Sequence, residues 1–212
     1  MLDPTETSLV RATHILRSSW SATLLYDQSP FETRCMIDPK TGVFILAIVD
    51  DALGASDITL ATPRDSFETR ARISIELSDQ ITEEQRDRYN AYHLPATTPM
   101  LAAGSFQYAK IDSGEVVTPE HCPLMNPLVS VMGPLCKALN ADRDRLSAVC
   151  TTLSGVAHES PLAVGVDTTG IDIRAGYGLV RLKLAEPIGH PDHALDSINT
   201  LLDSIDLDTG CA

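Results

Sequence analysis

The sequence has few basic residues for its length: 16 Lys plus Arg stand against 29 Asp plus Glu in 212 residues, a formal net charge of −13. Proteins that bind nucleic acid or anionic lipid need a concentrated basic surface, because the phosphates that they contact are negatively charged. We therefore expect neither nucleic acid nor a membrane surface as a partner. The acidic excess is interpreted as a feature of solubility.

A long hydrophobic run is also lacking. The longest apolar stretch, 43–49, has the length of one β-strand and is far too short to cross a bilayer. Asp3, Glu6 and Arg11 interrupt the N-terminal stretch, so we expect no signal peptide. The five cysteines form no C-x-x-C pair, which favours free thiols in a reducing compartment over a disulfide framework. The sequence thus predicts a cytoplasmic protein.

Motifs that would name a reaction are missing. The sequence contains neither G-x-x-x-x-G-K-S/T nor G-x-G-x-x-G, the loops that cradle phosphates in P-loop and Rossmann proteins. It contains no G-x-S-x-G, and the serine and histidine of GVAHES at 155–160 lack the strand–turn–helix context of a nucleophile. The six histidines show no H-x-x-x-H spacing on an expected helix. We therefore predict no metal centre, and the catalytic residues stay unassigned.

The first 118 residues combine one leading helix with short strands and turns. Pro4 begins the helix, and Leu9, Ala12 and Leu16 form its buried stripe. Apolar patterns predict the strands, at 20–26, 31–37, 43–49, 57–62, 72–77 and 105–111, with 116–117 continuing the sheet. Thr82 starts a capping box and a charged helix. Antiparallel strands joined by tight turns form a small barrel more readily than a doubly wound sheet, so we predict a closed barrel of six strands.

The rest of the chain predicts a linker and a second domain. The segment 119–139 holds three prolines in its first part and then a helix interrupted at Gly133–Pro134. The elements expected after it are a helix capped by Asn140 or Asp142, a strand at 162–167, a hairpin at 170–184 and a helix from Pro191. The predicted fold class is α+β: an antiparallel split β-barrel over 1–118 with a C-terminal α/β domain over 140–212.

The residue patterns predict which side of the hairpin is exposed and which side of the last helix is buried. The alternation of apolar and polar residues in the hairpin predicts one solvent-exposed face, which carries Arg181 and Lys183. Helical spacing predicts that the last helix buries one side, formed by Leu195, Ile198, Leu201, Leu202 and Ile205. The helix is expected to cover the apolar face of the hairpin, because both surfaces would otherwise stay exposed.

Several segments of the front half resemble the FMN-binding split barrel of pyridoxamine-phosphate-oxidase-like proteins. They are SATLLY at 21–26, PFET at 30–33, RISIEL at 72–77, RYNAYH at 88–93 and GSFQYAKI at 104–111. The closer match is the branch related to haem-utilisation proteins, in which a small α/β domain often follows the barrel. NADRDRL at 140–146 and GIDIRAGYGLVRLKLAEPI at 170–188 are similar to that domain.

The sequence departs from the family pattern at two places. Arg143 stands where the C-terminal domain usually has a histidine. The histidine-threonine-arginine-asparagine run that usually precedes the RISIEL-like strand has its best counterpart in 63–66, PRDS. Haem needs an axial His, Cys, Met or Tyr. Of the histidines, His93 is explained by the dipole at the end of its helix, and His121 lies in the proline-rich segment, where it is reachable.

The resemblance implies FMN, or alternatively haem, held at the interface of a homodimer. Thr33 falls where the family pattern has a serine or threonine, and Arg34, Arg64, Arg70 and Arg72 are the cations of the barrel. We predict Thr33, Arg34, Arg64 and Arg70 as the cofactor-binding residues. Three hypotheses stay open: a flavin-binding oxidoreductase-like protein, a haem-binding or haem-degrading protein, and a non-catalytic binding module that has lost its cofactor.

Overall fold

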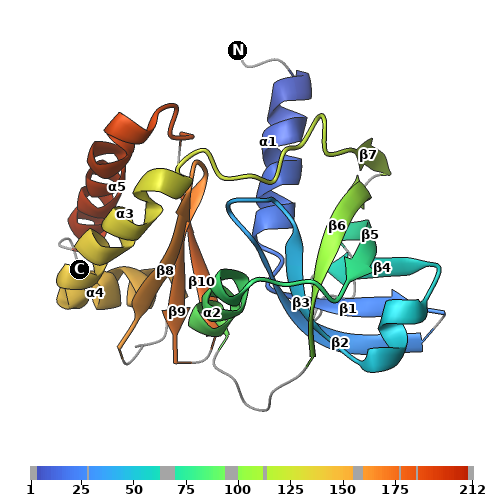
Figure 1. Cartoon of the computed structure of the whole chain (residues 1–212). Helices are drawn as coiled ribbons and strands as arrows, with labels where there is room; N and C mark the ends of the chain where they lie inside the picture. The colour runs from blue at the N-terminus through green and yellow to red at the C-terminus, as the bar shows by residue number, and fades with distance from the viewer. Residues whose placement is uncertain are drawn as a thin grey trace. The chain divides into compact units, whose positions relative to one another are not determined.

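Residues 4–27, 29–62, 70–93, 100–111, 114–154, 160–176, 178–184 and 186–209 are described by a computed structural model. The chain divides into two units, unit 1 (Met1–Met125) and unit 2 (Asn126–Ala212) (Figure 1). The segment predicted as a linker, 119–139, is shared between them, because its residues up to Met125 belong to unit 1 and the rest to unit 2.

Unit 1 contains a closed antiparallel barrel. Its elements are α1 (Pro4–Arg17), β1 (Ser21–Tyr26), β2 (Ser29–Ile37), β3 (Phe44–Ile48), the 3-10 turn η1 (Asp50–Gly54), β4 (Ile58–Thr62), β5 (Ala71–Ser78), α2 (Glu83–Tyr92), β6 (Met100–Ile111) and β7 (Glu115–Val117). Within the described ranges, six strands follow each other in the order β3-β2-β1-β4-β5-β6, and β6 returns to pair with β3. The short β7 extends β6. The predicted six-strand barrel is confirmed.

The barrel closes through the first half of β6. Met100 pairs with Ile48, and Gly104 pairs with Phe44. These residues precede 105–111, the strand that the sequence predicted, so the closing segment was missed. Its last three residues, at 102–104, are alanine and glycine, and the packing is close there: a Cβ on Gly104 would lie 3.1 Å from Cδ1 of Ile75.

The two faces of the barrel wall bury different clusters. Inside, Phe44 and Leu46 belong to the main core, into which α1 places Ala12 and Leu16. Outside, α2 covers part of the wall with a separate cluster, made of Met36, Ile45, Ala47, Tyr89 and Leu101. α2 begins with the capping box expected at Thr82. The outer wall formed by β1, β4, β5 and the second half of β6 carries the site described below.

Unit 2 is an α/β domain, as predicted. Its elements are α3 (Val129–Ala141), α4 (Arg143–Ser154), β8 (Leu162–Asp167), β9 (Gly170–Ala175), β10 (Gly178–Lys183), the 3-10 turn η2 (Pro191–His193) and α5 (Ala194–Thr209). The strands form an antiparallel sheet in the order β10-β9-β8. The helices lie on one side of this sheet in Figure 1, and apolar residues of helices and strands share one core.

Two details of unit 2 differ from the prediction. The helix α3 runs through Gly133–Pro134 without a break, because Leu135 and Leu139 behind the proline are held in the core. In α5, Ala194 is buried and Leu195 is 45% exposed. The helix therefore buries positions 194, 198 and 202, a strict four-residue spacing, and Leu195 lies outside this stripe.

Gly170 is required by the close approach of β10. A Cβ at this position would lie 2.7 Å from the carbonyl oxygen of Leu182 and 3.0 Å from Cζ of Arg181. We expect Gly170→Ala to lower the free energy of unfolding by about 1–3 kcal/mol, because the backbone of β10 must move. Gly176→Ala is the matched control, since Gly176 has open space around it. Urea denaturation followed by circular dichroism measures both, and equal stability of the two variants would contradict the argument.

Candidate functional site

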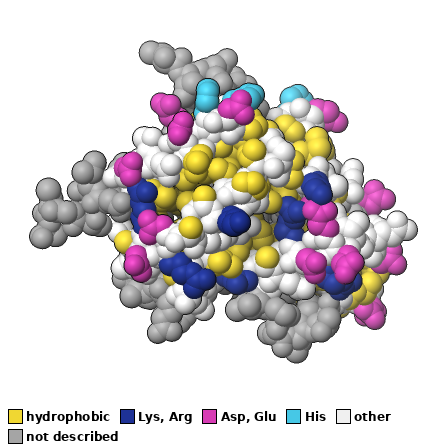
Figure 2. Space-filling view, turned by 60° about the vertical axis from the view of Figure 1, so that its left-hand side comes forward, with side chains coloured by type: hydrophobic (Ala, Val, Ile, Leu, Met, Phe, Trp, Pro, Cys, Tyr) yellow, Lys and Arg dark blue, Asp and Glu magenta, His cyan; other side chains and the backbone are white. Residues whose placement is uncertain are grey.

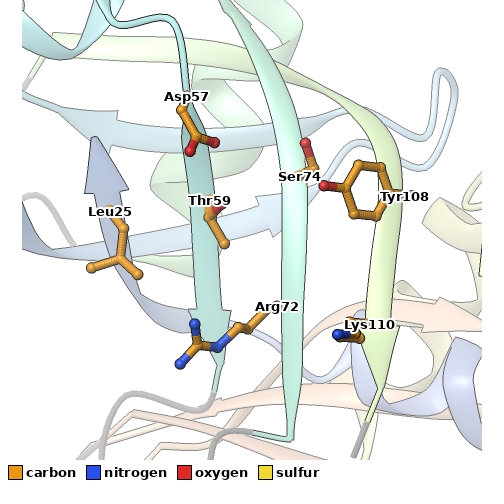
Figure 3. Close-up of a pocket in the computed structure, with 7 residues that line it drawn as sticks. All are labelled: Leu25, Asp57, Thr59, Arg72, Ser74, Tyr108 and Lys110. Atoms are coloured by element: carbon orange, nitrogen blue, oxygen red, sulfur yellow. The ribbon is translucent and has the colours of Figure 1, made fainter. Parts of the chain in front are cut away.

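A pocket of about 370 Å³ lies on the outer wall of the barrel, and we call it the outer pocket. Its lining residues are Leu25, Asp57, Thr59, Arg72, Ser74, Tyr108 and Lys110. They come from β1, β5, β6 and from β4 with the residue that precedes it. Figure 3 shows Asp57 toward one end of the pocket, Arg72 and Lys110 toward the other, and Thr59, Ser74 and Tyr108 between them. Pockets of this size are typical of small-molecule sites.

Two cations lie side by side at one end of the outer pocket. Arg72 of β5 and Lys110 of β6 are directly paired across the strands, and both side chains are exposed. In the part of the chain that the structure describes, neither forms an ion pair. Like charges placed directly opposite each other on a sheet are destabilising. An anion bound between them would remove this repulsion, so the pair fits a ligand with a phosphate or carboxylate.

The middle of the outer pocket is a row of neutral side chains. Leu25 pairs with Thr59, Thr59 with Ser74, and Ser74 with Tyr108, so the row crosses four neighbouring strands. It offers one aliphatic surface, two aliphatic hydroxyl groups and one aromatic ring with a phenolic hydroxyl. Tyr108 is 51% exposed, which leaves its ring accessible to a flat ligand.

A β-bulge on β6 produces this arrangement. The register between β5 and β6 shifts between Ser74 and Ile75, which leaves Gln107 without a partner. Strict alternation predicts that Phe106 and Tyr108 share a face. That prediction is wrong: Phe106 packs against the core, whereas Gln107 and Tyr108 are both exposed. Bulges of this kind re-aim side chains and occur often at functional sites.

Three of the four residues predicted to bind the cofactor, Thr33, Arg34 and Arg70, are described, and none of the three lines the outer pocket. Thr33 is buried on β2 and donates its hydroxyl proton to the carbonyl oxygen of Ala47 at 2.6 Å, with the oxygen of Arg34 at 3.0 Å. Arg34 is exposed on β2. Arg70 is exposed immediately before β5, two residues from Arg72, and Arg64 lies outside the described residues. Of the described arginines that the sequence offered as barrel cations, Arg72 lines the pocket.

Sequence reasoning missed the other pocket residues. The available signal was the polar face of three adjacent strands: Thr59 on β4, Ser74 on β5 and Lys110 on β6 all alternate with buried residues. Recognising the site also required the pairing of β4 with β5 and of β5 with β6, together with the bulge. The sequence predicted each strand but not the register between them.

The structure gives a different reason for His93 than the helix dipole. The imidazole is buried, and its Nε2 donates to the carbonyl oxygen of Cys35 at 2.9 Å. Burial lowers the pKa of His93 to about 4, so the ring is neutral at pH 7. Burial also raises the pKa of the Cys35 thiol to about 12. Both groups are therefore buried, and neither lines the outer pocket.

His121 contacts the side chain of a nearby threonine. Nδ1 of His121 lies 3.0 Å from Oγ1 of Thr118. Among the residues described, no three His, Cys, Asp or Glu side chains form a group that could hold a metal ion. On the face shown in Figure 2, acidic side chains are scattered among Lys and Arg. The helices that the structure describes are too short or too polar to span a membrane.

Comparison with known proteins supports the fold. No protein-family model matches the chain, and no curated protein matches its sequence. Among solved structures, a protein of unknown function from Agrobacterium tumefaciens strain C58 is similar, with a TM-score of 0.68, 19% identity, and coverage of 95% of this chain and 98% of that chain. A haem-binding protein from Mycobacterium smegmatis also matches, with a TM-score of 0.40, 18% identity, and coverage of 98% and 100%. The first likeness shows the fold alone, and the TM-score of the second is too low to support a conclusion.

Proposed function

We propose that unit 1 binds flavin mononucleotide in the outer pocket and that the protein is an FMN-dependent oxidoreductase. The observation that carries the proposal is the cross-strand pair Arg72 and Lys110, placed beside the accessible ring of Tyr108 in one pocket. A phosphate needs cations and hydroxyl groups, and an isoalloxazine needs a flat apolar surface. The outer pocket offers both within about 370 Å³.

The residues at the cationic end have distinct roles in this proposal. Arg72 and Lys110 would hold the phosphate, and Arg70, which lies immediately before β5, would add positive charge. Thr59 and Ser74 would bind the ribityl hydroxyls. Tyr108 would pack against the ring system. When bound, the flavin supplies hydride or single-electron chemistry, and the protein binds and orients it.

A second candidate is haem, favoured by one specific residue. Tyrosine serves as an axial haem ligand in some proteins. Among the described lining residues of the outer pocket, Tyr108 is the one of a haem-ligand type, and Arg72 and Lys110 could pair with the propionates. The two candidate ligands would use different parts of Tyr108. Haem would be bound by its hydroxyl group, whereas a flavin would pack against its ring. This difference separates them experimentally.

We also propose that the protein is a homodimer in which a second copy covers the open side of the outer pocket. Tyr108 on β6 is 51% exposed and Val116 on the neighbouring β7 is 57% exposed. Apolar side chains exposed together beside a pocket are typical of protein interfaces. Sedimentation velocity of the purified protein, with and without FMN, measures the state directly, and a monomer in both conditions would contradict this part of the proposal.

The test is a titration of the purified protein with FMN, riboflavin and haemin, followed by absorbance and fluorescence. We expect FMN to bind and Arg72→Ala to weaken it about tenfold to a hundredfold, because one charge-assisted hydrogen bond contributes about 1.5–3 kcal/mol. Riboflavin, which lacks the phosphate, should bind weakly and equally to both proteins. Tyr108→Phe should leave FMN binding nearly unchanged and should abolish a haem Soret shift if haem is the ligand.

Arg34→Ala is the matched control, since Arg34 is an exposed arginine on β2 outside the outer pocket. If Arg34→Ala loses FMN affinity and Arg72→Ala does not, the phosphate site lies on β2, and its assignment to Arg72 and Lys110 is contradicted. Arg70→Ala and Arg64→Ala are titrated in parallel, because wild-type affinity in both would remove these residues from the site. A wild-type protein that binds neither FMN nor haemin at saturating concentration would favour the non-catalytic binding module.

A further inference from the structure

The outer pocket carries opposite charges at its two ends. Arg72 and Lys110 mark the cationic end, whereas Asp57 marks the other (Figure 3). The sheet register gives the separation: Arg72 pairs with Ala61 of β4, which lies four residues along the chain from Asp57. At about 3.3 Å per residue, the two ends are about 13 Å apart. The pocket is therefore polarised along the strands.

The neutral row between these ends sets the shape of the space. Leu25, Thr59, Ser74 and Tyr108 cross four strands spaced about 4.8 Å apart, so the row is about 14 Å wide. No charged side chain belongs to it. The row separates the two charged ends, so a ligand that reaches both must lie along the strands, from Arg72 to Asp57.

Asp57 is available to a ligand. Its side chain is exposed, and it forms no ion pair within the described residues. An ionised carboxylate accepts hydrogen bonds and donates none. Asp57 therefore attracts an N–H or O–H donor and repels an anionic group at its end of the pocket, whereas Arg72 and Lys110 do the reverse.

We infer that the outer pocket selects ligands with one anionic end and one hydrogen-bond donor at the opposite end, and that Asp57 determines this specificity. The inference rests on the proposed function and adds the direction in which the ligand lies. In a flavin mononucleotide, the phosphate and the imide N–H of the ring are at opposite ends. The phosphate lies at Arg72 and Lys110, and the imide edge lies at Asp57. Molecules with anionic groups at both ends are rejected.

The experiment compares FMN with 3-methyl-FMN, in which a methyl group replaces the imide hydrogen, on the full-length wild type, Asp57→Ala and Arg72→Ala. We expect the wild type to prefer FMN by about tenfold, the value of one hydrogen bond to a charged group. Asp57→Ala should bind the two flavins equally. Arg72→Ala should bind both more weakly and keep the preference. Asp51→Ala, an exposed acid outside the pocket, is the matched control and should resemble the wild type.

The outcomes separate the inference from the proposed function. If FMN binds with a dependence on Arg72 but the preference over 3-methyl-FMN is absent or survives in Asp57→Ala, the specificity role of Asp57 is overturned and the flavin site stands. If the wild type binds no flavin, both are overturned. Circular dichroism of each variant verifies folding, which an exposed Asp→Ala change leaves intact.

Discussion

Replacing Arg181 by methionine is expected to lower the free energy of unfolding of unit 2 by about 3–5 kcal/mol. The guanidinium group is buried, with 4% of the side chain exposed. Its Nη2 donates to both carboxylate oxygens of Asp167 at 2.7 and 2.8 Å and to Oγ1 of Thr169 at 2.8 Å, and its Nη1 donates to Asp172 at 2.6 Å. Methionine keeps the volume but leaves two buried carboxylates without this cation.

The loss is large because whole domains are stable by only about 5–15 kcal/mol. Hydrogen exchange of the amides in β9 and β10, measured across a urea series, reports the stability of unit 2 directly. Lys183→Met is the matched control, since Lys183 is exposed two residues further along the same strand. The triple variant with Asp167→Asn and Asp172→Asn should recover part of the loss, because no charge then stays buried. A change below about 1 kcal/mol in Arg181→Met would contradict the assigned role.

Arg181 also shows why the alternation of apolar and polar residues along a strand predicts the wrong exposure for some charged side chains. The pattern of β10 predicts a solvated face for Arg181 and Lys183, and it is right for Lys183. Arg181 is buried because it meets Asp172 on β9 and Asp167 on β8, two strands away in the sheet. Alternation identifies which residues share a face. It contains no information on which distant acids will surround one of them.

Strand location could be predicted well because the apolar residues are contiguous or alternate cleanly. β3 is an uninterrupted apolar run and is buried at every position, and β8 was predicted with its observed bounds, Leu162–Asp167. The start of β6 was missed because alanine and glycine, at 102–104, have low strand propensity. Those residues become a strand through their pairing with β3, an effect of the closed barrel and not of local sequence.

The candidate site was harder to predict than the fold for the same reason. The sequence named Arg72 among the barrel cations but did not select it as a cofactor-binding residue. Its partner Lys110 lies 38 residues later and becomes its neighbour only through the β5–β6 register. Tyr108 depends in addition on the bulge at Gln107. Thr33 was chosen from a family pattern, and the structure places its hydroxyl group on a backbone carbonyl inside the barrel. Pockets on the wall of a barrel are formed by register, which short motifs do not record.

Acid is expected to destabilise unit 1 through His93 by about 3 kcal/mol between pH 6.5 and pH 4. The folded-state pKa of His93 is lowered from 6.5 to about 4 by burial. In this interval the unfolded chain binds a proton that the folded chain does not, so stability falls as the pH falls. Above pH 6.5 the ring is neutral in both states and the contribution is complete, and below pH 4 it is charged in both and the slope ends. Each pKa unit corresponds to about 1.4 kcal/mol.

The variant that isolates this effect is His93→Gln, whose amide can keep a hydrogen bond to the carbonyl oxygen of Cys35 without titrating. Other groups near His93 are common to both proteins: the rings of Tyr89 and Tyr92 at 4.8 and 6.4 Å, and the charge of Arg34. Urea denaturation at a series of pH values, followed by the fluorescence of Trp20, reports on unit 1. The difference in unfolding free energy between the two proteins should shrink or reverse as the pH falls from 6.5 to 4. A difference that is constant across this range would show that the pKa of His93 is the same in the folded and unfolded states, and would contradict the lowered pKa.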